Sequence, residues 1–405
     1  MIIKGKDIIV LGIQAWDIEI GSNCKNIATE MSRENRVLYV NSPLDRISKF
    51  KERKTEKIKK RLRMQSGKEA NLVNVGSNIW TLYPKTTIES INWINSKRVF
   101  NGVNRMNTKK FTNDIKSAID SLDFKDFILF NDSSMFLGQH LKEFLKPKIY
   151  VYYMRDYLTK NPYWKKHGVR LEPKLIKSAD LIVNNSTLYA EYGAQFNKHS
   201  YMVGQGCDTS IFNDLEREII VPKDFENLPK PIIGYVGFLS SRRLSIEIIE
   251  HMALAKPEWS IVLVGPEDDN FKASNLHNLT NVYFLGSRDS SELPNYIKGF
   301  DIAMNPQLIN DATIGNYPRK IDEYLAMGKP TLASATKAMD YFKDYTYLGI
   351  TKEDFVTLAE KALKENNENL EIKRRTYGSS HSWKNNVKEI YTCMQLVAEE
   401  KGIQI

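Results

Sequence analysis

Residues 232–243, IIGYVGFLSSRR, decide the fold of this chain. Ile232 to Val236 is a short run rich in β-branched residues, of the kind that forms a buried strand. The run ends at Gly237, and apolar residues then recur at helical spacing from Leu244 to Met252. A strand that turns through a glycine into an amphipathic helix is the repeating unit of a parallel sheet covered by helices.

The same unit recurs through both halves of the sequence. In the second half it predicts strands at Ile232–Val236, Ser260–Val264, Val282–Leu285, Asp301–Met304 and Pro330–Ala333. In the first half it predicts strands at Asp7–Gly12, Arg36–Val40, Phe127–Phe130, Lys148–Tyr152, Leu181–Asn184 and Ser200–Val203, with helices at Asn23–Glu34, Thr108–Ser121, Met135–Leu145 and Arg170–Lys177. The predicted fold class is α/β: two Rossmann-like domains, parallel sheets with helices on both faces, and a cleft between the domains.

A polar, proline-containing segment interrupts this alternation at residues 213–231. We interpret it as a linker between an N-terminal domain at residues 1–212 and a C-terminal domain at residues 232–381. At 405 residues the chain is long enough for two domains, each with its own core.

The composition is that of a folded protein, with 42% apolar and 26% charged residues. No run of 18 apolar residues occurs, and the apolar residues near the N-terminus lead into a strand rather than a signal-peptide pattern. We therefore expect a cytoplasmic protein. Cys24, Cys207 and Cys393 are far apart in sequence, so we expect neither a disulfide framework nor a zinc site.

Positive charge is concentrated in one segment. The formal net charge is +9, and Lys49 to Arg63 alone holds nine Lys or Arg against two Glu. A basic, weakly amphipathic helix here would bind an anionic membrane surface; a mobile, solvated loop is the alternative. Nucleic acid is not expected as a partner, because no aromatic stacking platform accompanies the charges. The expected membrane contacts are Lys57, Lys59, Lys60 and Arg61.

The most informative functional stretch is NYPRKIDEYLAMGKP at residues 316–330. It predicts a helix from Tyr317 to Met327, with Pro318 in its first turn and Gly328 as its terminator. A diphosphate placed before this helix would meet free backbone N–H groups and the Lys320 ammonium. Glu323, on the same face, could accept hydrogen bonds from ribose hydroxyls. The alternative is an ordinary surface helix with an ion pair.

The turn after Ile232–Val236 is a second candidate for phosphate binding. Gly237 lets a backbone approach a ligand, and Arg242 or Arg243 can pair with phosphate in a forked geometry. The turn is neither a Gly-x-Gly-x-x-Gly fingerprint nor a Walker loop, which argues against a nicotinamide dehydrogenase. A turn with solvated charges is the alternative.

Taken together, these motifs resemble the donor-binding domain of GT-B glycosyltransferases, especially the large retaining group that extends sugars on glycans and lipids. The likeness includes glycosyltransferases of bacterial surface-polysaccharide assembly, among them the teichuronic acid type. In the first half, 178–186 and 204–208 resemble the end of the acceptor domain of the same family. The motifs that carry the resemblance in the second half are 234–237, 264–266, 282–286, 293–296, 300–302 and 318–330.

The resemblance implies that the second domain binds a nucleotide-sugar donor, with Glu323 on the ribose and Lys320 and the arginines on the diphosphate. Many retaining members carry a further glutamate eight positions earlier, where this chain has Gly315. Its contact to the sugar would then come from backbone near 314–316. No Asp-x-Asp occurs, in agreement with metal-independent transfer that needs no cofactor. The predicted donor-binding residues are Gly237, Phe238, Arg242, Arg243, Gly265, Asn316, Tyr317, Lys320 and Glu323.

The resemblance also places an acceptor loop after the first strand, at residues 16–23. Ser22 and Asn23 would bind an acceptor hydroxyl or simply cap the next helix. Asp17 would orient acceptor hydroxyls, and Gly21 would give the loop its freedom; solvent exposure is the simpler account of Asp17. Asp156 follows a strand where related enzymes keep a polar group near the reacting sugar, so it is the predicted catalytic residue. A salt bridge to Arg155 is the alternative.

The sequence therefore predicts a glycosyltransferase that moves a sugar from a nucleotide donor to a glycan or lipid-linked acceptor, with retention of configuration and without a metal. The resemblance further implies that a C-terminal helix at about 382–405 crosses back to the first domain. Two rivals remain open. A sugar-nucleotide epimerase of the same fold would turn over without an acceptor. A non-catalytic protein that binds membrane or nucleic acid would tolerate loss of Lys320 and Glu323.

Overall fold

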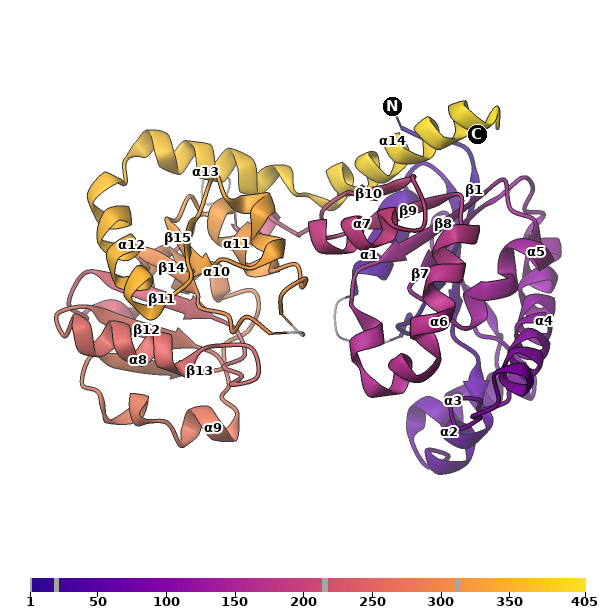
Figure 1. Ribbon diagram of the computed structural model, residues 1–405, viewed down its shortest axis with the longest axis horizontal. Coiled ribbons are helices and arrows are strands. Elements are labelled where there is room, and N and C mark those ends of the chain that lie inside the picture. Colours follow the sequence, from indigo (N-terminus) through magenta and orange to yellow (C-terminus); the bar gives the residue numbers. More distant parts are fainter. Residues whose placement is uncertain (1, 18–21, 213–217, 311–312) are drawn as a thin grey trace. The chain divides into compact units, whose positions relative to one another are not determined.

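The computed structural model describes residues 2–17, 22–212, 218–310 and 313–405. The chain forms two compact units, Met1–Gly206 together with Asn386–Ile405, and Cys207–Asn385. Each unit is built on its own sheet, with helices packed on the faces (Figure 1). Among the described helices, none is long and apolar enough to cross a membrane.

The first unit holds an eight-stranded sheet in the order β10-β9-β8-β7-β1-β2-β5-β4. Neighbouring strands are parallel except β4 and β5, which are antiparallel. The strands are β1 (Asp7–Gly12), β2 (Arg36–Asn41), β4 (Leu72–Gly76), β5 (Ile79–Leu82), β7 (Ile128–Asp132), β8 (Ile149–Met154), β9 (Leu181–Asn184) and β10 (Ser200–Met202), and β3 (Leu44–Asp45) pairs separately with β6 (Thr87–Ile88). The helices are α1 (Asn23–Met31), α2 (Arg46–Lys51), α3 (Glu56–Gln65), α4 (Lys97–Leu122), α5 (Leu141–Leu145), α6 (Pro162–Ser178) and α7 (Thr187–Ala194).

The second unit holds a six-stranded parallel sheet in the order β13-β12-β11-β14-β15-β16. Its strands are β11 (Ile232–Val236), β12 (Ser260–Val264), β13 (Val282–Gly286), β14 (Ile302–Asn305), β15 (Thr331–Ser334) and β16 (Tyr347–Gly349). Its helices are α8 (Ile246–Ala255), α9 (Asp269–Lys272), α10 (Leu293–Gly299), α11 (Arg319–Ala326), α12 (Lys352–Glu365) and α13 (Glu368–Ser380). Apolar clusters fill both faces of this sheet, which explains the nearly continuous apolar character of its strands.

Short 3-10 turns connect several elements: η1 (Leu137–His140), η2 (Leu158–Lys160), η3 (Ser210–Phe212), η4 (Lys223–Phe225), η5 (Asn275–Asn278) and η6 (Lys337–Phe342). The last helix, α14 (Trp383–Lys401), packs on the first unit for most of its length. Asn35 donates to the Tyr391 hydroxyl at 2.9 Å, and the Asn386 amide donates to the carbonyl of Val203 at 2.9 Å.

The boundaries between the units differ from those expected. The division falls after Gly206 and after Asn385, rather than after residues 212 and 381. Phe212 and Phe225 lie in an apolar cluster of the second unit, where the Phe225 ring packs against Phe300. The described part of the predicted linker, residues 218–231, therefore belongs to the second unit rather than standing between the two.

Candidate active site

Two glycine turns and one lysine converge at the carboxyl edge of the second sheet. Gly237 follows β11 with φ +134°, and Gly265 follows β12 with φ +147°. A Cβ on Gly265 would lie 2.0 Å from the carbonyl oxygen of Gly237, so the two turns touch. A Cβ on Gly237 would lie 2.3 Å from Cε of Lys320. The backbone conformation disfavours a side chain at both positions, and at Gly265 the backbone of Gly237 also leaves no space for one.

Lys320 reaches this turn from the first turn of α11. Its ammonium lies 5.4 Å from the ring centroid of Tyr235, on β11. The Tyr324 hydroxyl, one turn further along the helix, accepts a hydrogen bond from the N–H of Val236 at 3.0 Å and holds α11 against the strand end. In the described part of the chain, no carboxylate is within ion-pair distance of Lys320. Its charge is therefore available to an anionic ligand at the glycine turns.

The loop that continues from Gly237 is fixed by its neighbours and presents two exposed arginines. Leu239 donates its backbone N–H to the carbonyl of Pro266 at 2.8 Å, and Ser241 donates to the carboxylate of Asp268 at 2.7 Å. Arg242 and Arg243 follow, both exposed, and neither guanidinium has a partner within the described ranges. Phe238 is 55% exposed beside them. The predicted diphosphate ligands are thus on one edge of the sheet with Lys320.

Glu323 lies on α11, largely buried, with 15% of its side chain exposed. Its carboxylate is 3.8 Å from the Arg319 guanidinium, at the long limit of an ion pair. Burial raises the pKa of this carboxyl above its ordinary value, although Arg319 and Lys320 both oppose the rise. A buried carboxylate with weak protein partners can accept hydrogen bonds from hydroxyl groups, as predicted for a ribose.

Helix α11 starts at Arg319, two residues later than predicted, and ends before Gly328, which has φ +71° as expected of a terminator. Asn316, half-buried, donates its backbone N–H to the carbonyl of Thr313. Tyr317 is in a different place from the one expected. It is 4% exposed, packs in an apolar cluster, and its hydroxyl donates to Asp322 at 3.1 Å. The Tyr317 side chain therefore belongs to the core and is not a donor contact.

Asp322 is a residue that the sequence did not single out. It is fully buried, and its Oδ1 lies 2.6 Å from Nδ1 of His381, just after α13. Burial raises its pKa, against the lowering effect of His381. The pair ties α11 to the end of α13 and so fixes the helix that carries Lys320 and Glu323. Asp322 and Glu323 are adjacent acidic residues, and the sequence alone does not show which of the two side chains points into the core.

Three charged side chains interact at the carboxyl ends of β7 and β8 in the first unit. Arg155, after β8, donates through Nε to the buried carboxylate of Asp132 at 2.8 Å and through Nη1 to Asp156 at 3.0 Å. Asp132 is 0% exposed, whereas the side chain of Asp156 is 47% exposed. Asp156 therefore makes the salt bridge weighed as the alternative to a catalytic role. The bridge also holds its carboxylate at the carboxyl edge of the sheet, where a catalytic group would be needed.

A cluster of buried polar groups lies at the same edge. The amides of Asn23 and Asn185 both donate to Oε1 of Gln205, at 2.7 and 3.0 Å. Ser22 and Ser186 occupy the N-cap positions of α1 and α7, yet neither hydroxyl caps its helix. Both hydroxyls are buried and lack hydrogen-bond partners within the described chain, as does Oδ1 of Asn185. Unpaired polar atoms of this kind are costly unless a ligand or water satisfies them.

The capping role considered for Ser22 is thus wrong as far as its side chain is concerned. Gln205 was not predicted, and its only sequence signal is its place in the 204–208 motif. Gly21, the predicted flexible point of the loop, lies outside the described residues.

Asp17 binds two of the predicted membrane cations. Its carboxylate lies 2.9 Å from Lys60 and 3.4 Å from Arg61, and the Arg61 guanidinium stacks 4.1 Å from the ring centroid of Tyr83. Burial alone would raise the pKa of Asp17, but the two cations lower it. Arg61 is 6% exposed and cannot reach a membrane surface, so its assignment as a membrane contact is wrong.

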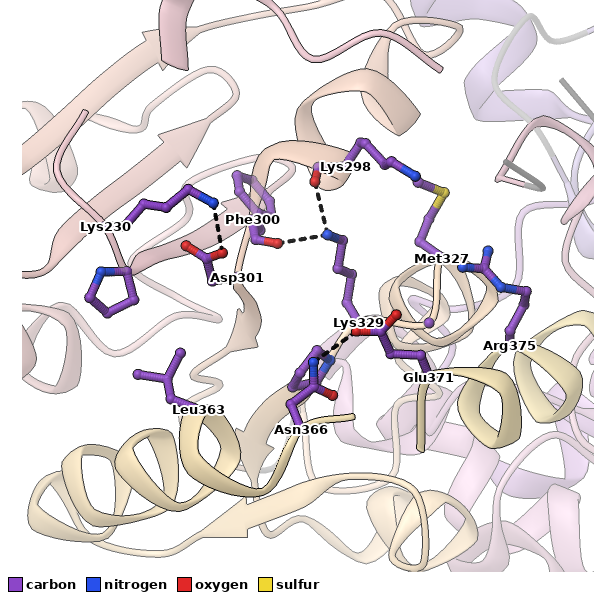
Figure 2. A pocket seen from close by; sticks show the side chains of 13 residues that line it. Lys230, Lys298, Phe300, Asp301, Met327, Lys329, Leu363, Asn366, Glu371 and Arg375 are labelled. Carbon is purple, nitrogen blue, oxygen red and sulfur yellow. Dashed lines mark hydrogen bonds and ion pairs between the residues drawn. The ribbon is translucent and has the colours of Figure 1, made fainter. Parts of the chain in front are cut away.

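A separate cavity of about 500 Å³ lies at the amino ends of β11, β14 and β15, away from the glycine turns (Figure 2). Its cations face protein groups: the Lys329 ammonium donates to the carbonyls of Lys298 and Phe300 at 2.8 and 2.7 Å, and Lys230 pairs with Asp301 at 3.2 Å. These interactions tie helix and strand ends together. Among the described residues, no cluster of His, Cys, Asp or Glu is arranged to hold a metal ion.

The two Rossmann-like units have the GT-B fold, and solved structures share this fold over nearly the whole chain. HepE of Anabaena in complex with UDP is 12% identical, with 96% of this chain and 99% of that one covered and a TM-score of 0.62. The structure titled trehalose-6-phosphate from E. coli bound with UDP-2-fluoro glucose is 10% identical, with 96% and 98% covered and a TM-score of 0.65.

The second unit also has a sequence match. Residues 230–364 match the family described as glycosyl transferases group 1, which confirms the predicted resemblance of this unit. A putative teichuronic acid biosynthesis glycosyltransferase, TuaH of Bacillus subtilis (strain 168), is 31% identical over 159 residues. The matched region spans 38% of this chain and 40% of that relative.

Proposed function

We propose that the protein transfers a sugar from a nucleotide-sugar donor to a glycan or lipid-linked acceptor in bacterial surface-polysaccharide synthesis. The carrying observation is the convergence of Gly237, Gly265 and Lys320 at one sheet edge. Two glycines leave room for a diphosphate, and the Lys320 ammonium, which has no carboxylate partner among the described residues, supplies the opposite charge. The match of residues 230–364 to glycosyl transferases group 1 and the partial match to TuaH support the same reaction and setting.

In the proposed reaction, Lys320, Arg242 and Arg243 bind the diphosphate and stabilise the charge that grows on it as the sugar leaves. Glu323 accepts hydrogen bonds from the ribose hydroxyls and so orients the nucleotide. An acceptor hydroxyl, held by Ser22, Asn23, Asn185, Ser186 and Gln205, attacks the anomeric carbon. Asp156 interacts with the reacting sugar. Transfer proceeds with retention and without a metal, because protein cations take the role that a divalent ion would have.

We propose a cytoplasmic enzyme that works at the inner membrane surface. The neighbouring structures contain UDP, UDP-glucose or a fluoro analogue, which makes UDP-sugars the first donors to test.

The test measures nucleoside diphosphate released from UDP-glucose and other nucleotide sugars, with and without a mixture of lipid-linked saccharides and surface glycans. The expected result is release that depends on the acceptor mixture, with sugar recovered on the acceptor. Conversion of the nucleotide sugar into its epimer without an acceptor would instead identify an epimerase.

A further inference from the structure

Three segments of the first unit bring exposed apolar side chains together beside the basic helices. Ile47 and Phe50 are one helical turn apart on α2, with 44% and 71% exposure. Trp93 and Val99, before and within the first turn of α4, are 69% and 52% exposed. Tyr163, in the first turn of α6, is 55% exposed. Single exposed apolar residues are ordinary, but a group of large ones on adjoining segments marks an interaction surface.

Hydrogen bonds and one ion pair hold these segments side by side. Arg46 of α2 pairs with Glu89, and the backbone N–H of Ile47 donates to the Ser90 hydroxyl at 2.9 Å. Lys166 of α6 donates to the carbonyl of Trp93 at 3.2 Å. Between α2 and the start of α4 lies a groove of about 600 Å³ whose apolar lining is Ile47, Trp93, Ile94, Val99 and Val103.

The structure also shows which cations beside this surface are open to a partner. Arg63 pairs with Glu69 and Lys59 with Glu56, while Asp17 engages Lys60 and Arg61. Four others, all exposed, have no carboxylate partner among the described residues: Lys51, Arg53, Lys54 and Lys57. They run from Lys51, the last residue of α2, to Lys57, in the first turn of α3.

We propose that this surface, formed by Ile47, Phe50, Trp93, Val99 and Tyr163 with Lys51, Arg53, Lys54 and Lys57, docks on an anionic lipid bilayer. Aromatic and aliphatic side chains enter the boundary between headgroups and acyl chains, where tryptophan and tyrosine are favoured. The cations meet the negative headgroups. An anionic bilayer offers negative headgroups to the exposed cations and acyl chains to the exposed apolar side chains, so charge complementarity together with the apolar groove favours it.

The inference rests on the proposed function, since a lipid-linked acceptor would be presented at such a bilayer. It changes the predicted contact set: of the four cations expected from the sequence, only Lys57 remains in it. The membrane contact is a composite of three segments rather than a single basic helix.

The test is sedimentation of the full chain with vesicles of phosphatidylcholine alone and with added phosphatidylglycerol, without nucleotide. We expect binding only to the anionic vesicles. Phe50→Ser/Trp93→Ser and Lys51→Glu/Lys54→Glu/Lys57→Glu should each weaken it at least about tenfold, since each removes one of the two components of membrane affinity. The matched control, Lys116→Glu/Lys174→Glu/Lys177→Glu, reverses the same charge on the later parts of α4 and α6 and should bind like the wild type.

Equal loss of binding in the control would show that only the net charge of the protein matters, and would contradict the proposed docking surface. Failure of the wild type to bind anionic vesicles would contradict it as well. Nucleotide release with a soluble acceptor should be unchanged in all three variants. A wild type that releases nucleotide normally but does not bind anionic vesicles would overturn this inference alone. A wild type that binds these vesicles but shows no acceptor-dependent release would overturn the proposed function alone.

Discussion

Replacement of Lys320 by alanine is expected to lower nucleotide-sugar turnover by about 10²- to 10³-fold, the usual cost of removing one group that stabilises transition-state charge. The effect should be large because Lys320 lies against the Gly237 turn with no protein carboxylate to share its charge in the described chain. The loss should appear in kcat and in kcat/KM together if the contact strengthens as the diphosphate leaves.

The matched control for this change is Lys361→Ala, an exposed lysine on α12 of the same unit. It should leave turnover within about twofold of the wild type, as surface changes away from a site usually do. Both variants should melt as the wild type does, because neither ammonium is part of a described ion pair. Normal turnover by the Lys320→Ala protein would show that Lys320 of α11 does not stabilise the diphosphate.

Gly237→Ala is expected to destabilise the second unit by about 1–3 kcal/mol, the cost of a non-glycine residue at φ +134°, and to abolish donor binding. The new Cβ would meet the flexible end of the Lys320 side chain at 2.3 Å. The lysine can move aside at little cost in stability, but its ammonium then leaves the glycine turn, so donor binding is lost beyond the loss of stability. Denaturant unfolding, followed together with nucleotide binding, measures both.

Gly286→Ala provides the control for backbone strain alone. Gly286 also has a positive φ, +71°, but a Cβ there would meet nothing within 4 Å. This variant should lose only about 1–2 kcal/mol and keep full nucleotide affinity. If both variants lose stability equally and Gly237→Ala still binds nucleotide, the close approach of Lys320 to the turn has no functional role.

The strands of both sheets could be predicted from the sequence because their apolar runs are short and are bounded by turn residues. β1, β9, β11 and β12 have the predicted limits. The sheet edges were harder: β4 and β5 form a short antiparallel pair at one edge, and Asn74 and Gly76 break the apolar pattern there. The first half of α4 was missed because it is rich in asparagine, a weak helix former.

The residues of the candidate site could also be predicted only in part. Motif spacing brought Gly237, Lys320 and Glu323 to one edge, because parallel strands place their carboxyl ends together. Sequence could not show that Tyr317 turns into the core to meet Asp322, since both directions suit a tyrosine before a helix. The pairing of Asp17 with Lys60 joins residues more than forty positions apart and leaves no local pattern.

The central claim is a nucleotide-sugar site at α11 and the glycine turns, and a thermal-shift titration of UDP and other nucleoside diphosphates tests it most directly. A ligand at one hundred times its dissociation constant adds about 2.7 kcal/mol to the native state. We predict stabilisation by one nucleoside diphosphate, lost in Lys320→Ala/Glu323→Gln and retained in Lys361→Ala. Stabilisation that persists in the double variant, or no response of the wild type to any nucleotide, would contradict the account.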